Sequence, residues 1–302
     1  MLKYHHHNHI GAILYMNLCD LKTIKNILGA FKVRLKKEYG QNFLTDRSAV
    51  EEIADNCCYD ADSVILEVGP GIGVLTYELA LRFKKIIALE IDDTLMPILN
   101  YTLNEFDNVE VLNQDVMKTD LDSLLAPYFE SGKVSVCANL PYYITTPILM
   151  KILESRLPFE TVTVMVQEEV ADRLCAVAGK SDYGAITAVL GYYGTTEKLF
   201  SVPADRFVPA PKVNSAVVRI TLHKVCPYHP KDEALMFRTI KAAFEQRRKT
   251  LSNALSNGFP ELTKEQITQV IERCGHRADI RGEKLSTAQF CDLSDALYEV
   301  LN

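Results

Sequence analysis

Short apolar runs alternate with longer amphipathic stretches between residues 62 and 222. The runs are apolar throughout, without a regularly polar face, and they therefore predict buried parallel strands. They are Val64–Val68, Ile86–Ile91, Val109–Asn113, Val134–Ala138 and Val162–Val166, with later candidates at Leu199–Val202 and Val217–Leu222. With helices in the gaps, this alternation predicts an α/β fold with a doubly wound, Rossmann-like sheet. One of these helices is expected to be capped by Thr146 and to have Pro147 at its first position.

A helical pattern replaces the strands after residue 222. Residues 224–230 contain two prolines and indicate a linker. The next apolar residues have the spacing of one helical stripe: Ile240, Phe244, Leu251 and Leu255. Thr263 with Gln266 and Ser286 with Gln289 have the spacing of capping boxes, so two further helices are expected.

The chain of 302 residues exceeds the usual size of a single hydrophobic core. The two patterns therefore predict two domains, a Rossmann-like domain over residues 31–222 and a small all-helical domain over residues 223–302. Residues 1–30 form an N-terminal extension that includes a short histidine-containing tract, and the sequence indicates no role for it.

Composition excludes several classes of protein. The chain is 48% hydrophobic and 24% charged, as expected for a folded globular protein, and its net charge of -6 argues against general electrostatic coating of nucleic acid. No apolar run approaches the roughly 18 residues that span a bilayer, and no signal peptide is found, so a cytoplasmic location is expected. The eight cysteines form no CxxC pair and have no neighbouring histidine at zinc-ligand spacing, so we expect no metal.

Three glycines follow the first predicted strand, in Glu67-Val-Gly69-Pro-Gly71-Ile-Gly73. Glycines there let the backbone turn sharply and approach a ligand at the carboxyl edge of the sheet. The GxGxG spacing differs from the GxGxxG of dinucleotide folds, which weakens an NAD interpretation. We expect Gly69 and Gly71 to contact a nucleotide-like cofactor.

Carboxylates stand at the ends of the next two predicted strands, Glu90 closing the second strand and Asp115 following the third. Glu90 can accept hydrogen bonds from both hydroxyls of a ribose, and Asp115 can accept one from an adenine amino group. A glycine turn and two acids at three consecutive strand ends converge on one crevice. They favour an adenosyl cofactor without a phosphate, consistent with S-adenosylmethionine. Ile91 and Val116, beside the two acids, complete the expected cofactor site.

The sharpest local signal is Asn139-Leu140-Pro141-Tyr142, at the end of the fourth predicted strand. An adenine N6 amine is a poor nucleophile because its lone pair is delocalised into the ring. The side-chain oxygen of Asn139 and the carbonyl of Leu140, held rigid by Pro141, can polarise that amine as charge develops on nitrogen. The segment holds no carboxylate, His or Cys, so no general base and no covalent intermediate are predicted.

Two aromatic residues are candidates for holding the base. Tyr142 offers a ring for stacking on an extruded base, a contact worth roughly 1–3 kcal/mol. Phe207, in the proline-rich segment Phe207–Val213, is a candidate for the opposite face, although aromatic residues beside proline also commonly pack loops.

From residue 36 onward the sequence resembles the ribosomal RNA adenine dimethyltransferases, most closely their small-subunit branch, the KsgA family. The segments that carry the resemblance are Tyr39–Asp46, Glu67–Gly73, Glu90–Asp92, Gln114–Asp115, Asn139–Thr145, Val166–Val170, Phe207–Val213 and Ala243–Leu251. The cofactor contacts that it implies are Asn42, Leu44, Gly69, Glu90, Asp115 and Asn139, with S-adenosyl-L-methionine as methyl donor. It further implies N6,N6-dimethylation of two adjacent adenosines near the 3′ end of 16S ribosomal RNA, late in biogenesis of the small ribosomal subunit.

Two other functions remain open at this point. Resistance enzymes that methylate adenine in large-subunit 23S ribosomal RNA share the fold and a similar catalytic tetrad, but Gln246-Arg247-Arg248-Lys249 on the first C-terminal helix favours the small-subunit branch. The other alternative is a non-catalytic RNA- or DNA-binding factor, like the mitochondrial transcription factors that resemble these enzymes. An intact Asn139–Tyr142 segment and Glu90 argue against lost chemistry.

Basic residues supply the candidate RNA contacts. Arg248, Lys249, Lys36 and Lys37 are the expected phosphate contacts, although such charges are often only solvated. Arg247 falls close to the apolar stripe and is expected to form an inward structural pair instead. The expected substrate is an exposed or flippable adenine, and a monomer is expected because nothing demands a dimer.

Overall fold

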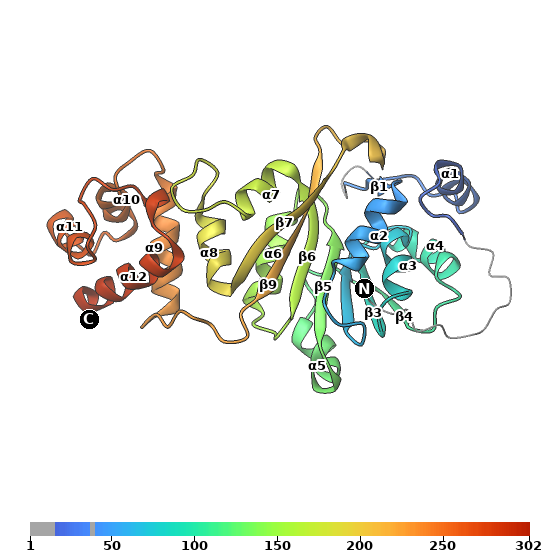
Figure 1. Cartoon of the computed structure of the whole chain (residues 1–302), viewed down its shortest axis with the longest axis horizontal. Helices are drawn as coiled ribbons and strands as arrows, with labels where there is room; N and C mark the ends of the chain where they lie inside the picture. Colours follow the sequence, from blue (N-terminus) through green and yellow to red (C-terminus); the bar gives the residue numbers. More distant parts are fainter. Residues whose placement is uncertain (1–15, 37–39) are drawn as a thin grey trace.

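The computed structural model describes residues 16–36 and 40–302 of the chain. A seven-stranded sheet forms its centre (Figure 1). Its strands are β2 (Val64–Val68), β3 (Lys85–Glu90), β4 (Val109–Asn113), β5 (Val134–Asn139), β6 (Thr161–Gln167), β7 (Gly194–Val202) and β9 (Ser215–Leu222). All the strands expected from the apolar runs are confirmed, with some ends shifted.

The strands lie in the order β4-β3-β2-β5-β6-β9-β7. The first five are parallel, whereas β9 is antiparallel to both β6 and β7. The prediction of parallel strands is therefore wrong at this edge. β7 and β9 are joined without a crossover helix, through the 3₁₀ turn η3 (Ala204–Arg206) and the short strand β8 (Phe207–Val208), and such a connection suits antiparallel pairing.

Helices cover both faces of the sheet. Those before β7 are α1 (Leu21–Ala30), α2 (Arg47–Asp55), α3 (Val74–Ala80), α4 (Met96–Thr102), α5 (Leu121–Ser131), α6 (Thr145–Glu154), α7 (Glu168–Leu174) and α8 (Ala185–Tyr193), with the 3₁₀ turn η2 (Asp93–Leu95). Side chains alternate along each central strand, so Ile65 belongs to the hydrophobic core on one face and Leu66 to the core on the other. Burial on both faces explains the uninterrupted apolar runs.

Helix α6 begins earlier than the sequence pattern predicts. Thr145 is its first residue, and Ile144 precedes it without a side-chain cap. The hydroxyl of Thr145 instead donates to the carbonyl of Pro141 at 3.1 Å. The predicted cap at Thr146 is therefore wrong, and the helix start is tied directly to the Asn139–Tyr142 segment.

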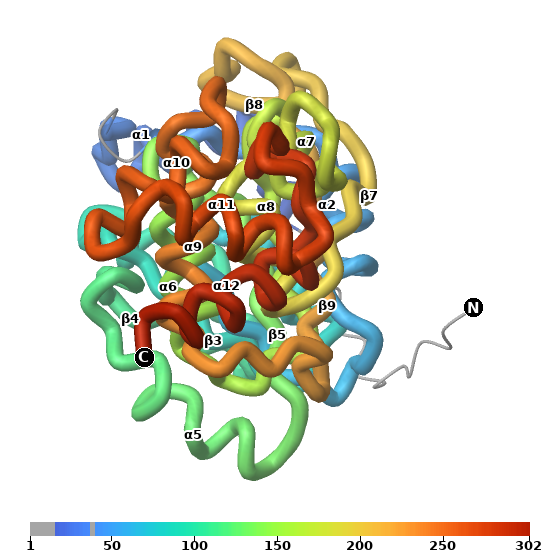
Figure 2. The backbone as a smooth tube through the Cα atoms, turned by 90° about the vertical axis from the view of Figure 1, so that its left-hand side faces the viewer, coloured from blue at the N-terminus to red at the C-terminus, as the bar shows by residue number. Residues whose placement is uncertain are grey.

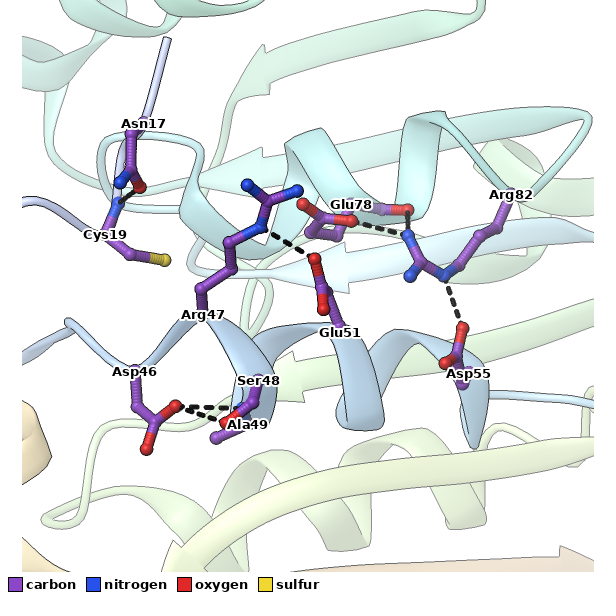
Figure 3. Close-up of polar contacts among 10 residues, drawn as sticks. All are labelled: Asn17, Cys19, Asp46, Arg47, Ser48, Ala49, Glu51, Asp55, Glu78 and Arg82. Atoms are coloured by element: carbon purple, nitrogen blue, oxygen red, sulfur yellow. Dashed lines mark hydrogen bonds and ion pairs between the residues drawn. The ribbon is translucent and has the colours of Figure 1, made fainter. Parts of the chain in front are cut away.

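Ion pairs tie α2 to α3 on one side of the sheet (Figure 3). The Arg82 guanidinium lies 2.6 Å from Asp55 at the end of α2 and 2.6 Å from Glu78 on α3. Asp46 caps the start of α2 by accepting from the backbone N–H of Ala49. These contacts fix α2, and with it the segment that precedes α2, over the carboxyl edge of the sheet.

Helix α1 packs on the same side as α2 and α3. Ile24 and Ile27 are buried, and they belong to the core that contains Val50 and Ile53 of α2. The apolar face of α1 is therefore part of the core of the sheet domain, whereas the sequence pattern places residues 1–30 outside that domain. The histidine-containing tract lies outside the described residues, and its role stays unassigned.

The C-terminal region is helical, as predicted. It consists of α9 (Glu233–Glu245), α10 (Leu251–Gly258), α11 (Lys264–Arg273) and α12 (Thr287–Leu301), with the 3₁₀ turn η4 (Gly282–Lys284) before α12. Both predicted capping boxes are confirmed, at α11 and α12. Figure 1 places these helices beyond the β7 edge of the sheet, and Figure 2, viewed from that end of the molecule, shows them in front of the sheet. Tyr183, Ala188 and Tyr192 join their core, so the sheet domain supplies part of it.

The predicted single helix through Ile240 and Leu255 is wrong. Residues 246–250 break it, so the two halves of the apolar stripe lie on α9 and α10. The guanidinium of Arg247 donates to the carbonyls of Ser181 and Tyr183, at 2.9 Å for the latter, and lies 3.5 Å from a carboxylate oxygen of Glu283. Arg247 therefore forms a structural pair, as predicted, but it does so from an exposed turn and not from the inward face of a helix.

Among the described residues, no helix is both long and apolar enough to cross a membrane.

Candidate cofactor and active site

A pocket lies at the carboxyl ends of β2, β3 and β5, beneath the segment Gly40–Leu44. The space inside it, open solvent included, is about 900 Å³. Ten of the predicted site residues line it together: Asn42, Leu44, Gly69, Gly71, Glu90, Ile91, Asn139, Leu140, Pro141 and Tyr142. The glycine turn, Glu90 and the Asn139–Tyr142 segment therefore lie around one pocket, whereas Asp115, the third member of the predicted convergence, does not line it.

The glycine turn has the backbone geometry that its spacing predicts. Gly69, Gly71 and Gly73 all have positive φ angles, which only glycine adopts without strain. At Gly71 an added Cβ would also lie only 3.0 Å from the ring of Phe43, a tight contact. The turn therefore lets the roof of the pocket approach the sheet edge closely.

Glu90 is held rigidly at the end of β3. One carboxylate oxygen accepts from the backbone N–H of Asp92 at 2.8 Å, and the other accepts from the N–H of Gly71 at 3.1 Å. The residue is 4% exposed. Burial raises the pKa of Glu90, and the two backbone hydrogen bonds oppose that rise. Each oxygen keeps further lone pairs, so the carboxylate can still accept from a ligand hydroxyl.

Glu67 is a second buried acid of this pocket, to which the sequence pattern assigned no role. It is 1% exposed, and its Oε2 has no hydrogen-bond partner among the described residues. Burial raises the pKa of Glu67 to about 8; the hydroxyl of Thr76 acts against this rise, and the charge of Glu90 adds to it. A buried carboxyl with one unpartnered oxygen in a pocket is suited to a cationic group of a ligand, because a cation favours its ionised form.

The Asn139–Tyr142 segment presents two acceptors. The amide nitrogen of Asn139 donates to the carbonyl of Asn42 at 3.4 Å, which leaves its Oδ1 without a donor among the described residues. Leu140 is anchored by its own N–H, which donates to Met165 at 3.2 Å, while its carbonyl accepts no described hydrogen bond. Both acceptors belong to residues that line the pocket.

Tyr142 is half-buried beside these acceptors. Its hydroxyl lies 2.6 Å from the hydroxyl of Ser215 on β9, which fixes the ring at the pocket wall. Burial raises the pKa of Tyr142, and the hydrogen bond with Ser215 opposes the rise. The ring is therefore placed as a neutral, preoriented surface for stacking.

The pocket roof comes from Gly40–Leu44, which the sequence pattern alone would describe as a turn. Its last two residues form β1 (Phe43–Leu44), which pairs antiparallel with β8, Leu44 opposite Phe207. The side chain of Asn42 donates to the carbonyl of Gly40 at 2.9 Å and shapes the turn. Long-range strand pairing of this kind leaves no periodic signal in two residues.

Three predicted site residues do not line the pocket. Asp115 and Val116 follow β4, the neighbour of β3, and Asp115 accepts from the N–H of Met117 at 2.9 Å. Phe207 is 2% exposed and packs in the core that also contains Leu44. Its ring would have to be uncovered before it could stack on a base, so its stacking role stays a prediction.

The candidate RNA contacts differ in their surroundings. Arg248 and Lys249 are exposed in the turn between α9 and α10, not on a helix as predicted, and the face assignment based on helical spacing is therefore wrong. Lys36 lies at the other end of the molecule, with its ammonium 2.8 Å from the buried carboxylate of Asp92. Lys37 lies outside the described residues.

No metal-ligating group of three or more His, Cys, Asp or Glu side chains is found among the described residues.

Solved structures similar to this chain define its fold. A dimethyladenosine transferase from Plasmodium falciparum has a TM-score of 0.70 at 23% identity and covers 83% of this chain and 95% of its own. The 23S rRNA methyltransferase ErmE has a TM-score of 0.66 at 24% identity, with 85% and 99% covered. The chain thus has a Rossmann-like methyltransferase fold.

Sequence similarity then identifies the family. The family model described as ribosomal RNA adenine dimethylase matches residues 32–299. Two relatives are both named Ribosomal RNA small subunit methyltransferase A. The relative from Lachnoclostridium phytofermentans is 42% identical, and the match covers 93% of this chain and 98% of the relative. The relative from Geobacillus thermodenitrificans is 46% identical, and the match covers 90% of this chain and 94% of the relative. The chain belongs to the ribosomal RNA adenine dimethylase family.

Proposed function

We propose that this protein transfers methyl groups from S-adenosylmethionine to N6 of two adjacent adenosines near the 3′ end of 16S ribosomal RNA in the small ribosomal subunit, late in biogenesis. Two acceptors beside one pocket, Asn139 Oδ1 and the Leu140 carbonyl, are the single observation that carries the proposal. Relatives at 42–46% identity bear the name of small-subunit methyltransferases, which supports this choice of RNA.

The pocket fits S-adenosylmethionine by its donor set. Glu90 supplies a carboxylate for the ribose hydroxyls, and the glycine turn leaves the backbone accessible at the sheet edge. Glu67 supplies a buried carboxyl, whose Oε2 is unpartnered among the described residues, for a positively charged part of the cofactor. When bound, the cofactor supplies an electrophilic methyl group on a sulfonium. Asp115 and Val116 are proposed for the adenine end, next to β3.

The residues of this chain act by polarising and aligning the amine. Two acceptors draw on the two N–H bonds of the adenine amino group, which makes the nitrogen more electron-rich and fixes its direction. Tyr142 holds the extruded base by its ring. No side chain is required as a general base, because the cationic product nitrogen loses its proton to solvent.

The second methyl transfer uses one acceptor fewer. A monomethylated amine keeps a single N–H, so only one of Asn139 Oδ1 and the Leu140 carbonyl retains its hydrogen bond. The first methyl group then occupies the position of the N–H hydrogen that it replaced, and it faces the acceptor that has lost its hydrogen bond. We therefore expect the second transfer to depend more on stacking by Tyr142 than the first.

Arg248 and Lys249 are proposed as phosphate contacts, since both are exposed and have no ion-pair partner among the described residues. We further propose that the protein acts as a monomer without a metal in the cytoplasm, where ribosomal subunits assemble.

The test is a methylation assay on undermethylated small and large ribosomal subunits with labelled S-adenosylmethionine. We expect N6,N6-dimethyladenosine at two adjacent positions near the 3′ end of the small-subunit RNA. The Asn139→Ala variant is the matched negative control. Label confined to large-subunit RNA would favour the resistance-type function, and absence of any label would favour a non-catalytic binding role.

A further inference from the structure

Asp92 occupies an unusual position beside the proposed cofactor site. It is 0% exposed, and its carboxylate is surrounded by donors from three segments of the chain. One oxygen accepts from the ammonium of Lys36 at 2.8 Å and from the hydroxyl of Thr94 at 2.6 Å, and the other accepts from the amide of Gln41 at 2.9 Å. A buried charge is tolerated only when it is bonded in this way.

The electrostatic balance at Asp92 favours its ionised form. Burial acts to raise the pKa of Asp92, but hydrogen bonds from Lys36, Thr94 and Gln41 outweigh burial and hold the pKa below its ordinary value. The carboxylate therefore stays charged at neutral pH. The ammonium of Lys36 is bound to this carboxylate beside the pocket. Arg248 and Lys249 belong to a different region, the turn between α9 and α10.

Two parts of the pocket meet at this one carboxylate. The backbone N–H of Asp92 donates to Glu90 at 2.8 Å and so orients the acid proposed to bind the ribose. Its side chain holds the amide nitrogen of Gln41, whose amide oxygen accepts from the backbone N–H of Lys36 at 3.0 Å. Gln41 lines the pocket and precedes Asn42, whose carbonyl accepts from Asn139.

We propose that Asp92 is a positioning residue of the cofactor site, which sets Glu90 from the sheet side and Gln41 from the roof side in one geometry. Lys36 belongs to this cluster and is not a phosphate contact. The inference rests on the proposed use of S-adenosylmethionine and deepens it. Neither Asp92 nor Lys36 touches the reacting atoms, so both act through their neighbours.

This role separates binding from chemistry. Misplacing Glu90 and Gln41 weakens ground-state and transition-state binding of the cofactor equally, which raises KM and leaves kcat nearly unchanged at saturation. If Asp92 only stabilised the fold, its substitution would lower the melting temperature of the free protein, but the folded fraction would bind the cofactor with unchanged affinity.

The first experiment compares Asp92→Asn with Asp93→Asn. Asp93 is the matched control because it has the same charge and lies 3.9 Å from the Lys36 ammonium, but its side chain is 79% exposed. By calorimetry, we expect Asp92→Asn to raise the Kd of S-adenosylmethionine and of S-adenosylhomocysteine about tenfold or more, with Asp93→Asn within about twofold of the parent. Equal affinities for the two variants overturn the proposal.

A second pair of variants keeps the proposal testable if Asp92→Asn fails to fold. Lys36→Met is expected to weaken cofactor binding and to leave the salt dependence of RNA binding unchanged. Lys249→Met is expected to do the reverse, lowering the slope of log K against log salt by about one. If Lys36→Met lowers the salt slope and leaves cofactor affinity unchanged, Lys36 is a phosphate contact and the proposal is wrong.

The parent protein separates this inference from the proposed function. If the parent does not bind S-adenosylmethionine, the proposed function fails and this inference falls with it. If the parent binds and methylates RNA while Asp92→Asn behaves like Asp93→Asn, only the positioning role is overturned.

Discussion

Residue spacing predicted structure in two regions with opposite outcomes: the pocket at the carboxyl edge of the sheet formed, whereas a turn between α9 and α10 replaces the continuous helix that was expected. At the sheet edge, spacing along the chain translates directly into position, because parallel strands start and end in register. In the turn, Arg247 bonds to carbonyls that belong to the loop before α8. Residue spacing therefore predicts the structure where a buried strand fixes the backbone. It fails where the backbone is fixed by a partner far along the chain.

The same contrast separates the functions proposed for the two regions. Glu90 and Asn139 have partners on neighbouring elements that leave oxygen atoms available at the pocket. Arg248 and Lys249 are exposed in a turn that Arg247 holds in place. The first region is thus built for precise placement of a small ligand, and the second for adjustable electrostatic contact with a large one.

Asn139→Ala should give the largest effect. Loss of one acceptor at the developing charge is expected to lower the single-turnover rate of methyl transfer by about 10²–10³-fold, while the affinity for S-adenosylmethionine falls only partly. Rapid-quench kinetics with saturating cofactor measure the rate. Asn104→Ala, at an exposed site, is the control, and comparable rates for the two variants would exclude the role of Asn139.

Glu90→Ala should weaken cofactor binding by about 10–100-fold, because one or two charge-assisted hydrogen bonds to the ribose are lost. Calorimetry with S-adenosylmethionine measures the change. Glu110→Ala on the neighbouring strand is a matched control, since its side chain is 44% exposed and pairs with Lys85. Unchanged affinity in Glu90→Ala would reject the assignment of the ribose to β3.

Glu67→Gln should change how stability depends on pH. The pKa of Glu67 is raised to about 8 in the folded protein, so between about pH 5 and pH 8 the folded state binds more protons than the unfolded state. Stability from this group is therefore lost as pH rises through that window, by up to about 1.4 kcal/mol per pH unit. Urea unfolding of the free protein at several pH values tests this prediction, because the variant should lack that slope. Parallel pH profiles for parent and variant would show that Glu67 titrates normally.

Arg247→Ala and Arg248→Ala should differ in stability by a smaller amount. Arg247 bonds to two carbonyls and to Glu283, but its side chain is 45% exposed, so we expect a loss of about 1–2 kcal/mol. Arg248→Ala should remain within about 0.5 kcal/mol of the parent and should instead weaken binding to the ribosomal subunit. Urea midpoints measure the first effect and filter binding measures the second. A reversed order of the two midpoints would contradict the structural role of Arg247.

The sheet, the glycine turn, Glu90 and the Asn139–Tyr142 segment could be predicted because each follows from local pattern at a strand end. The roof could not, because β1 is only two residues long and forms by pairing with β8 far along the chain. The clustering of Lys36 and Gln41 around Asp92 also has no local signal, since a charge run on the sequence does not show which charges are paired. Phe207 illustrates the same limit, because burial depends on its neighbours and not on its motif.

The most direct test of the catalytic geometry is a crystal structure of the protein with S-adenosylhomocysteine and an RNA fragment that contains the target adenosine. We predict that the exocyclic nitrogen lies about 3 Å from both Asn139 Oδ1 and the Leu140 carbonyl, with the base against the ring of Tyr142. A bound adenine whose amino group points away from both acceptors would contradict the account.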